Sequence, residues 1–195
     1  MASGKFGVNL IFACVAALLA LTAATFYSKS IGTGNRLAAV PEPSGGAMPQ
    51  GSSSGDIAKR LADLEQLAGK DPQNPEYPGQ IANIYYDLGQ YDKALNFYRR
   101  SLTLRPGDPN VETDLATCYH YLGQDDKALE TLDKVLEYAP GFSQAMFNKG
   151  IVLINGKKNV QGGIKVWEDL LRSNPDFPHK AELEERIGQL KGSAQ

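Results

Sequence analysis

The sequence is poor in the residues that build disulfide frameworks and metal sites. Its 195 residues include two cysteines and two histidines, whereas a disulfide framework needs several cysteine pairs and a structural zinc site needs about four Cys or His ligands. It also lacks a phosphate-binding Gly-rich loop with Lys, a Gly-x-Ser-x-Gly turn, a Cys-x-x-Cys pair and a His-Glu-x-x-His helix. We therefore expect no enzymatic activity, no cofactor, no metal and no small-molecule substrate.

The sequence also has no excess of positive charge. Twenty Lys and Arg residues face 22 Asp and Glu residues, for a formal net charge of -2. Residues 1–55 hold three of the basic residues and one of the acidic ones, so residues 56–195 carry 17 basic and 21 acidic residues, a net charge of -4. Because nonspecific nucleic-acid binding depends on clustered Lys and Arg, this balance predicts no nucleic-acid partner.

Charged residues are absent between Phe6 and Ser28, and residues 8–27 are mostly Ala, Leu, Val, Ile and Phe. Twenty helical residues at ~1.5 Å each cover the ~30 Å hydrocarbon core of a bilayer. After a short N-terminal tail over residues 1–7, we therefore predict a single transmembrane helix over residues 8–27. A cleaved signal peptide is the alternative, which we do not favour because the apolar run is longer than the usual 7–15 residues.

The orientation of this helix is weakly encoded, because Lys5 precedes it while Lys29 and Arg36 follow it. We expect the short tail to stay in the cytoplasm and the rest of the chain to be extracytoplasmic, or periplasmic in a bacterium. Alanines recur at four-residue spacing within the run, at Ala16, Ala20 and Ala24. That spacing suits close packing with another transmembrane helix, although alanine is also common in such helices.

Residues 28–55 have almost no large apolar side chains to bury. Six Gly, six Ser and three Pro account for fifteen of the 28 positions. The composition predicts a flexible linker, whose root-mean-square span as a coil is roughly 30 Å. The segment that follows is then free to sample the space beside the membrane.

A repeat of 34 residues fills most of the remaining sequence. When residues 75–108 are set over residues 109–142, Leu88-Gly89-Gln90 matches Leu122-Gly123-Gln124 and Lys93-Ala94-Leu95 matches Lys127-Ala128-Leu129. In each unit the apolar residues fall at helical spacing in two stretches on either side of the Leu-Gly-Gln turn. Each unit is therefore predicted to be a pair of antiparallel helices.

These residues resemble the tetratricopeptide repeat (TPR) family, whose pattern is W-x2-L-G-x2-Y, then A-x3-F, then P. The Trp position departs from the pattern in both units. The remaining positions hold, unit by unit, Ile81-Ala82 and Leu115-Ala116, Tyr85 and Tyr119, Ala94 and Ala128, Tyr98 and Leu132, and Pro106 and Pro140. The pattern demands a small residue where helices cross, a large apolar residue beside it and Pro after the second helix.

A degenerate third unit, residues 143–177, has one extra residue, with Gly150, Leu153, Gly163, Trp167 and Pro175 at the family positions. Asn155-Gly156-Lys157-Lys158-Asn159 replaces its Leu-Gly turn, which predicts a longer, more basic loop. Residues 56–72 match the second half of a unit and predict a leading helix, while residues 178–195 predict a capping helix and tail. The fold class is thus all-α: a TPR array of about three repeats with eight helices, behind the transmembrane helix.

The resemblance implies a protein-binding module, because TPR arrays commonly hold a peptide or helix in a concave groove lined by the first helix of each repeat. Carried over position by position, the groove candidates combine amides, acids and aromatics, which suit a peptide backbone and its apolar anchors. They are Asn83, Tyr86, Asp87, Asp114, Thr117, His120, Tyr121, Phe147, Asn148, Ile151 and Asn155. Read without the resemblance, the same residues are ordinary exposed helix positions. Cys118 and Trp167 are expected in the core.

The basic clamp of chaperone-binding TPR domains is missing. Its cationic positions hold Gly79, Gln144 and Asn148, and only Asn83 agrees, so we expect no tight binding to acidic chaperone tails. The sequence favours a membrane-anchored TPR adaptor or scaffold in the cell envelope. Two alternatives remain: a client-holding factor similar to TPR proteins of c-type cytochrome maturation, and a permanent accessory subunit of a membrane protein complex.

Overall fold

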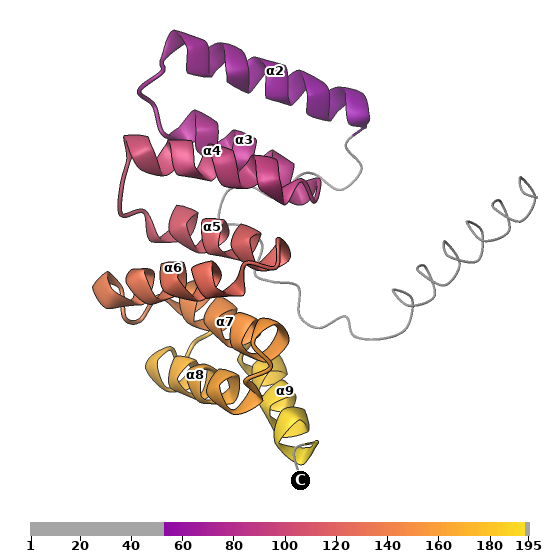
Figure 1. Cartoon of the computed structure of the whole chain (residues 1–195), viewed down its shortest axis with the longest axis vertical. Helices are drawn as coiled ribbons and strands as arrows, with labels where there is room; N and C mark the ends of the chain where they lie inside the picture. The colour runs from indigo at the N-terminus through magenta and orange to yellow at the C-terminus, as the bar shows by residue number, and fades with distance from the viewer. Residues whose placement is uncertain (1–52, 194–195) are drawn as a thin grey trace, which may run out of the picture. The chain divides into compact units, whose positions relative to one another are not determined.

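The computed structural model describes residues 53–193, and in this range the chain is built of α-helices without a strand. The helices follow one another along the long axis of a stacked array (Figure 1). They are α2 (Ser54–Lys70), α3 (Glu76–Asp87), α4 (Tyr91–Leu104), α5 (Pro109–Tyr121), α6 (Asp125–Tyr138), α7 (Ser143–Ile151), α8 (Val160–Ser173) and α9 (Lys180–Gly192), with a π-helical turn η1 (Val152–Gly156) after α7. The eight α-helices and the all-α class agree with the sequence prediction.

The leading helix α2 starts and ends two residues earlier than the range 56–72 predicted from the sequence. Ser53 caps its N-terminus: the Ser53 hydroxyl accepts from the Asp56 N–H at 3.2 Å, and the Asp56 carboxylate accepts from the Ser53 N–H at 3.1 Å. This capping box satisfies amide donors that a helix start otherwise leaves unpaired. Ser54 and Gly55, assigned to the linker by composition, are therefore helical.

Each pair of helices is joined by a turn of three residues, at residues 88–90, 122–124 and 157–159. The middle residue of every turn has a left-handed backbone: φ is 69° at Gly89, 71° at Gly123 and 56° at Lys158. Glycine adopts this conformation without steric cost, whereas Lys158 does not. The prediction of a longer loop in the third repeat is therefore wrong.

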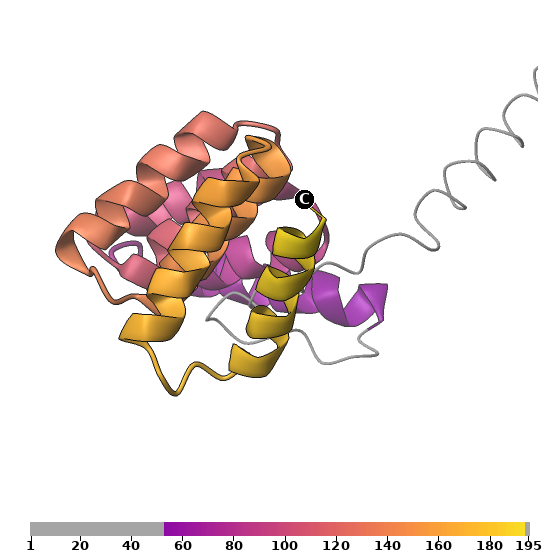
Figure 2. The same ribbon diagram turned by 90° about the horizontal axis from the view of Figure 1, so that it is seen from below.

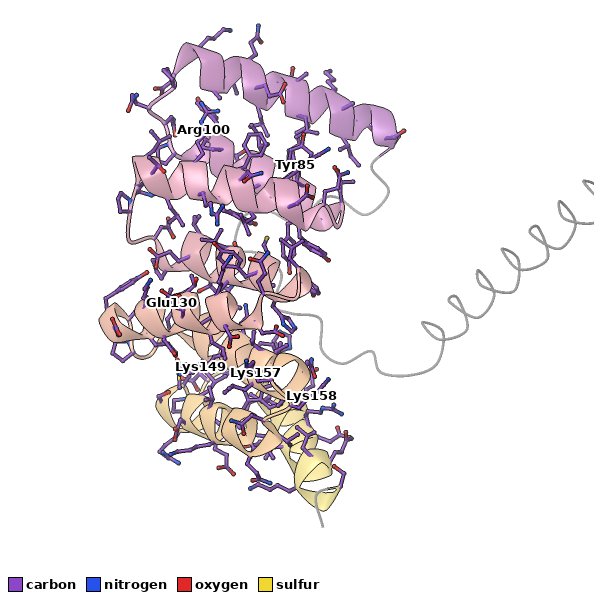
Figure 3. All side chains as sticks on the ribbon, in the orientation of Figure 1. Tyr85, Arg100, Glu130, Lys149, Lys157 and Lys158 are labelled. Carbon is purple, nitrogen blue, oxygen red and sulfur yellow. The ribbon has the colours of Figure 1, made fainter. Side chains whose placement is uncertain are left out.

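The extra residue of the third repeat lies inside its first helix. After Ile151 the backbone widens into η1, where the Lys157 N–H donates to the Val152 carbonyl five residues earlier at 3.0 Å. A π-helical turn accommodates one inserted residue without breaking the helix. Lys157 and Lys158 lie at the turn beside it (Figure 3), and Lys157 forms an ion pair of 2.6 Å with Asp126 in the first turn of α6.

The two helices of each repeat cross at small residues. In the first two repeats these are alanines with no exposed surface: Ala82 with Ala94, and Ala116 with Ala128. In the third repeat, glycine takes both positions. A methyl group on Gly150 would lie 2.1 Å from the Trp167 indole nitrogen, and one on Gly163 would lie 2.4 Å from the Ile154 side chain.

The missing methyl group at Gly150 makes room for Trp167, whose indole N–H donates to the Phe147 carbonyl at 2.9 Å. The Trp167 side chain is 4% exposed and Cys118 has no exposed surface. The prediction that both residues belong to the core is therefore confirmed.

Helix α9 closes the C-terminal end of the array, where it lies beside α8 (Figure 2). Leu183 and Ile187 of α9 are buried in one hydrophobic cluster with residues of α7 and α8. Its Glu182, Glu184 and Glu185 are exposed, which gives the helix the apolar inner face and polar outer face of a repeat-array cap. At the other end, Leu64 of α2 packs against Ile81 and Ile84 of α3.

The predicted transmembrane helix, residues 8–27, and residues 28–52 of the linker lie outside the described residues. Between residues 53 and 193, no helix combines the length and apolarity needed to cross a bilayer.

Candidate functional site

The first helices of the three repeats, α3, α5 and α7, carry residues that meet on one side of the array. We call this surface the first-helix face. Its members recur at three- or four-residue spacing along each helix, so they share one side of it. They are Asn83, Tyr86 and Asp87 of α3, Asp114, Thr117 and Tyr121 of α5, and Gln144 and Asn148 of α7.

Two side-chain hydrogen bonds join α5 to α7 on this face. The Gln144 amide donates to Asp114 Oδ1 at 3.2 Å, and the Asn148 amide donates to Thr117 Oγ1 at 3.0 Å. On α3, Asn83 accepts from the Tyr98 hydroxyl at 2.7 Å. These bonds fix the inner polar side chains of the face in place before any partner arrives.

The orientation of the Asn148 amide follows from its neighbours. The Thr117 hydroxyl donates its proton to the Thr113 carbonyl at 2.9 Å, so its oxygen can only accept from Asn148. Asn148 Nδ2 must therefore face Thr117, which leaves Asn148 Oδ1 buried without a hydrogen-bond partner. Asn148 and Thr117 also line a cavity of about 10 Å³ between α5, α6 and α7, about the size of one water molecule.

Asp114 is a buried acid that no cation among residues 53–193 balances. It is 5% exposed, and burial raises the pKa of its carboxyl from 3.8 to about 8. That value includes smaller increases from the negative charges of Asp108 and Asp87 and a decrease from the hydrogen bond that Gln144 donates. Removal from water disfavours a charged carboxylate, so the folded chain holds Asp114 at a cost in stability near neutral pH.

Three tyrosine rings form a cluster at the end of the first-helix face nearest the turns. Tyr91, the first residue of α4, stacks on Tyr121 with ring centroids 4.4 Å apart, and Tyr86 lies edge-on to both rings at 5.5 and 6.0 Å. Tyr121 is 45% exposed. Burial raises the pKa of Tyr86 far above its usual value, and the nearby Asp114 adds to the increase, so Tyr86 stays a neutral phenol beside that acid.

The groove candidates predicted from the sequence divide into four groups. Asp87, Tyr121 and Asn155 are exposed, whereas Asn83, Asp114, Thr117 and Asn148 are buried polar residues. Tyr86 and His120 are half-buried, and His120 Nδ1 lies 2.5 Å from Asp125 Oδ1. Phe147 and Ile151 differ from the rest, because both lie in the hydrophobic cluster that α9 covers.

Sequence reasoning missed two members of the site. Gln144 was considered only as a departure from a basic clamp, yet it is the hydrogen-bond partner of Asp114. Tyr91 belongs to the second helix of its repeat and was not considered at all, although it stacks on Tyr121. Its place immediately after the turn was a usable signal, because that turn brings the start of α4 beside the end of α3. Between residues 53 and 193, no group of three His, Cys, Asp or Glu side chains is arranged to hold a metal ion.

Comparison with known proteins agrees with this geometry. A tetratricopeptide repeat family model matches residues 85–146, which span the end of α3 to the start of α7. Residues 53–193 have the TPR fold. No curated protein sequence matches the chain.

Solved TPR structures superpose on the chain at low sequence identity. A crystal structure of MamA superposes with a TM-score of 0.60 at 17% identity, and the superposition covers 71% of this chain and 80% of the MamA chain. MamA from Desulfovibrio magneticus RS-1 superposes with a TM-score of 0.57 at 22% identity, covering 72% of this chain and 81% of the MamA chain. The first TPR domain of RPAP3, solved with the HSP90 peptide SRMEEVD, has a TM-score of 0.53 at 20% identity, covering 63% and 96%. At these identities the similarity concerns the fold.

The substitution Asp114→Asn should stabilise the folded chain above about pH 5. An amide still accepts from Gln144 but carries no charge to bury. Because the pKa of Asp114 is raised on folding from 3.8 to about 8, the wild-type carboxyl weakens folding progressively between these pH values. We expect a gain on the order of 1–4 kcal/mol at pH 8, vanishing near pH 4, in urea unfolding followed by circular dichroism.

The matched control is Asp176→Asn, which removes the same charge from an exposed position between α8 and α9. A change at that surface should stay within about 0.5 kcal/mol at every pH. If Asp114→Asn were less stable than wild type at pH 8, the buried acid would have to be a stabilising element of the fold.

Proposed function

We propose that this protein is a membrane-tethered TPR adaptor that binds a segment of a partner protein on its first-helix face. The observation that carries the proposal is the contrast within that face. Exposed Asp87 and Tyr121 lie beside buried Asn83, Asp114 and Asn148, and the buried side chains are fixed by hydrogen bonds rather than by apolar packing. A rigid polar floor with aromatic anchors at its edge suits a peptide or helix.

The solved neighbours support a protein partner, because the RPAP3 domain with the same fold is bound to a peptide. Phe147 and Ile151 are left out of the proposed surface, since both are buried in a hydrophobic cluster with residues of α8 and α9. The remaining candidates lie along α3 and α5, at the buried Asn148 of α7 and at the exposed Asn155 of η1. The proposed activity is binding without catalysis.

The tether is the second element of the proposal. Residues 8–27 are long and apolar enough to anchor the chain in a bilayer, and residues 28–52 provide a linker rich in Gly, Ser and Pro. We propose that the TPR array is thereby held at the outer side of the cytoplasmic membrane. The adaptor would then recruit or organise its partner within the cell envelope.

A photo-crosslinking amino acid placed at Tyr121 should capture the partner in living cells, because this ring is 45% exposed on the first-helix face. The matched control is the same amino acid at Tyr138, which is 50% exposed at the end of α6, a second helix. We expect a specific adduct from position 121 and none from position 138, with the adduct identified by mass spectrometry. Adducts of equal yield from both positions would contradict the proposed surface.

The full chain should sediment with membranes and resist alkaline carbonate extraction, whereas a chain starting at residue 56 should remain in the soluble fraction. Protease added to cells with a permeabilised outer membrane should degrade residues 56–195 while the cytoplasmic membrane is intact. Full-length protein in the soluble fraction would contradict the anchor, and protection from protease would contradict the orientation.

A further inference from the structure

The first-helix face has hydrogen-bond acceptors that lack donors. Asp114 accepts one hydrogen bond, at Oδ1, from Gln144. Two buried side-chain atoms in residues 53–193 lack a partner, Asn148 Oδ1 and Arg186 Nε. Asp114 Oδ2 is not one of them, so this oxygen reaches solvent although its residue is 5% exposed. Asp114 Oδ2 is therefore an acceptor available to a ligand that brings donors, whereas the buried Asn148 Oδ1 lies beside a cavity large enough for one water molecule.

The charged groups that act on Asp114 share its sign. Asp108 and Asp87 both oppose its ionisation, and the described part of the chain supplies no cation that favours it. Removing a carboxylate from water without a counter-charge is unfavourable, and a cation placed against Asp114 would reverse that cost. The electrostatic complement of this part of the face is thus positive.

Aromatic rings lie beside this acid. Tyr86 is close enough to Asp114 for the carboxylate to raise the pKa of its phenol, and Tyr121 lies 6.0 Å from Tyr86 and is 45% exposed. The faces of aromatic rings attract cations, and a planar guanidinium both stacks on a ring and donates five N–H groups. Acid, neutral acceptor and tyrosine rings together fit an arginine side chain better than an apolar or acidic one.

We propose that the partner segment bound by this protein carries an arginine whose guanidinium donates to Asp114 Oδ2 and lies against the Tyr86 and Tyr121 rings. This inference rests on the proposed function and specifies the partner's chemistry. An acidic peptide would need a basic site, whereas Asp114 makes this site acidic. The net charge of -4 over residues 56–195 adds a weaker, long-range attraction for a basic segment.

The arginine contact would be linked to pH, because Asp114 must lose its proton to form an ion pair. Burial holds the pKa of the unbound carboxyl at about 8, so binding should release a proton below that pH. The groups that surround Asp114 are Tyr86 and Asp87 of α3, Tyr98 of α4, Asp108 at the N-cap of α5, Cys118 of α5, and Gln144 of α7. Burial also raises the pKa values of Tyr86, Tyr98 and Cys118, which keeps them neutral in this range.

The test is selection of random twelve-residue peptides on the full-length protein in mild detergent. Wild type, Asp114→Asn and the control Asp176→Asn are compared in parallel. We expect peptides enriched on wild type and on Asp176→Asn to share an arginine, and their recovery on Asp114→Asn to fall. The best peptide is then remade with citrulline, which keeps the shape of arginine without its charge, or with lysine at that position.

Calorimetry with these peptides measures the contact directly. Citrulline should weaken binding to wild type by roughly tenfold or more, and lysine by less. On Asp114→Asn the difference between the arginine and citrulline peptides should shrink to the few-fold effect of the ring contacts that remain. The affinity of the arginine peptide for wild type should rise by up to roughly tenfold per unit between pH 6 and 8, and stay flat for Asp114→Asn.

The possible failures separate this inference from the proposed function. Peptides that bind wild type and Asp114→Asn equally, or that share no basic residue, would overturn the arginine contact and leave the binding face intact. Selection that enriches no peptide at all would overturn both. The thermal unfolding midpoint of each variant, compared with that of wild type, separates a loss of binding from a loss of structure.

Discussion

The close crossing of two helices at small residues is the constraint on which the whole array depends. Ala82 and Ala94 of the first repeat and Ala116 and Ala128 of the second have no exposed surface, and glycines occupy both positions in the third. Any larger side chain would push the helices apart and change the angle at which the next repeat stacks. Because every crossing is alike, successive first helices come to lie on the same side of the array, and the first-helix face follows from this regularity.

Regular stacking also explains why that face contains buried polar residues. Neighbouring first helices approach closely enough for Gln144 to reach Asp114 and for Asn148 to reach Thr117. Apolar side chains at these positions would stabilise the fold more simply, since a buried acid costs stability near neutral pH. Sites that carry such a cost are commonly sites of function, where the cost is offset when the ligand binds. Asp114 is the clearest case in this chain.

Much of the fold could be predicted from the sequence, because the 34-residue period places every helix pair and the small residues mark each crossing. Three features could not. The π-helical turn η1 depends on where the backbone accommodates an inserted residue. A lysine at position 158 does not indicate a left-handed backbone, because lysine rarely adopts one. The candidate site was predicted as a family pattern, without burial. Phe147 and Tyr121 therefore look alike in the sequence, whereas Phe147 is buried in a hydrophobic cluster with residues of α8 and α9 and Tyr121 is 45% exposed.

The central claim about this protein is that a partner covers the surface formed by α3, α5 and α7. Amide hydrogen exchange of the full-length protein, measured alone and with its crosslink-identified partner, tests this claim most directly. We predict that the partner slows exchange in α3 and α5 and near Asn148 of α7, while α4, α6 and α8 change little. Protection confined to α4, α6 and α8 would contradict the account, because it would place the partner on the opposite side of the array.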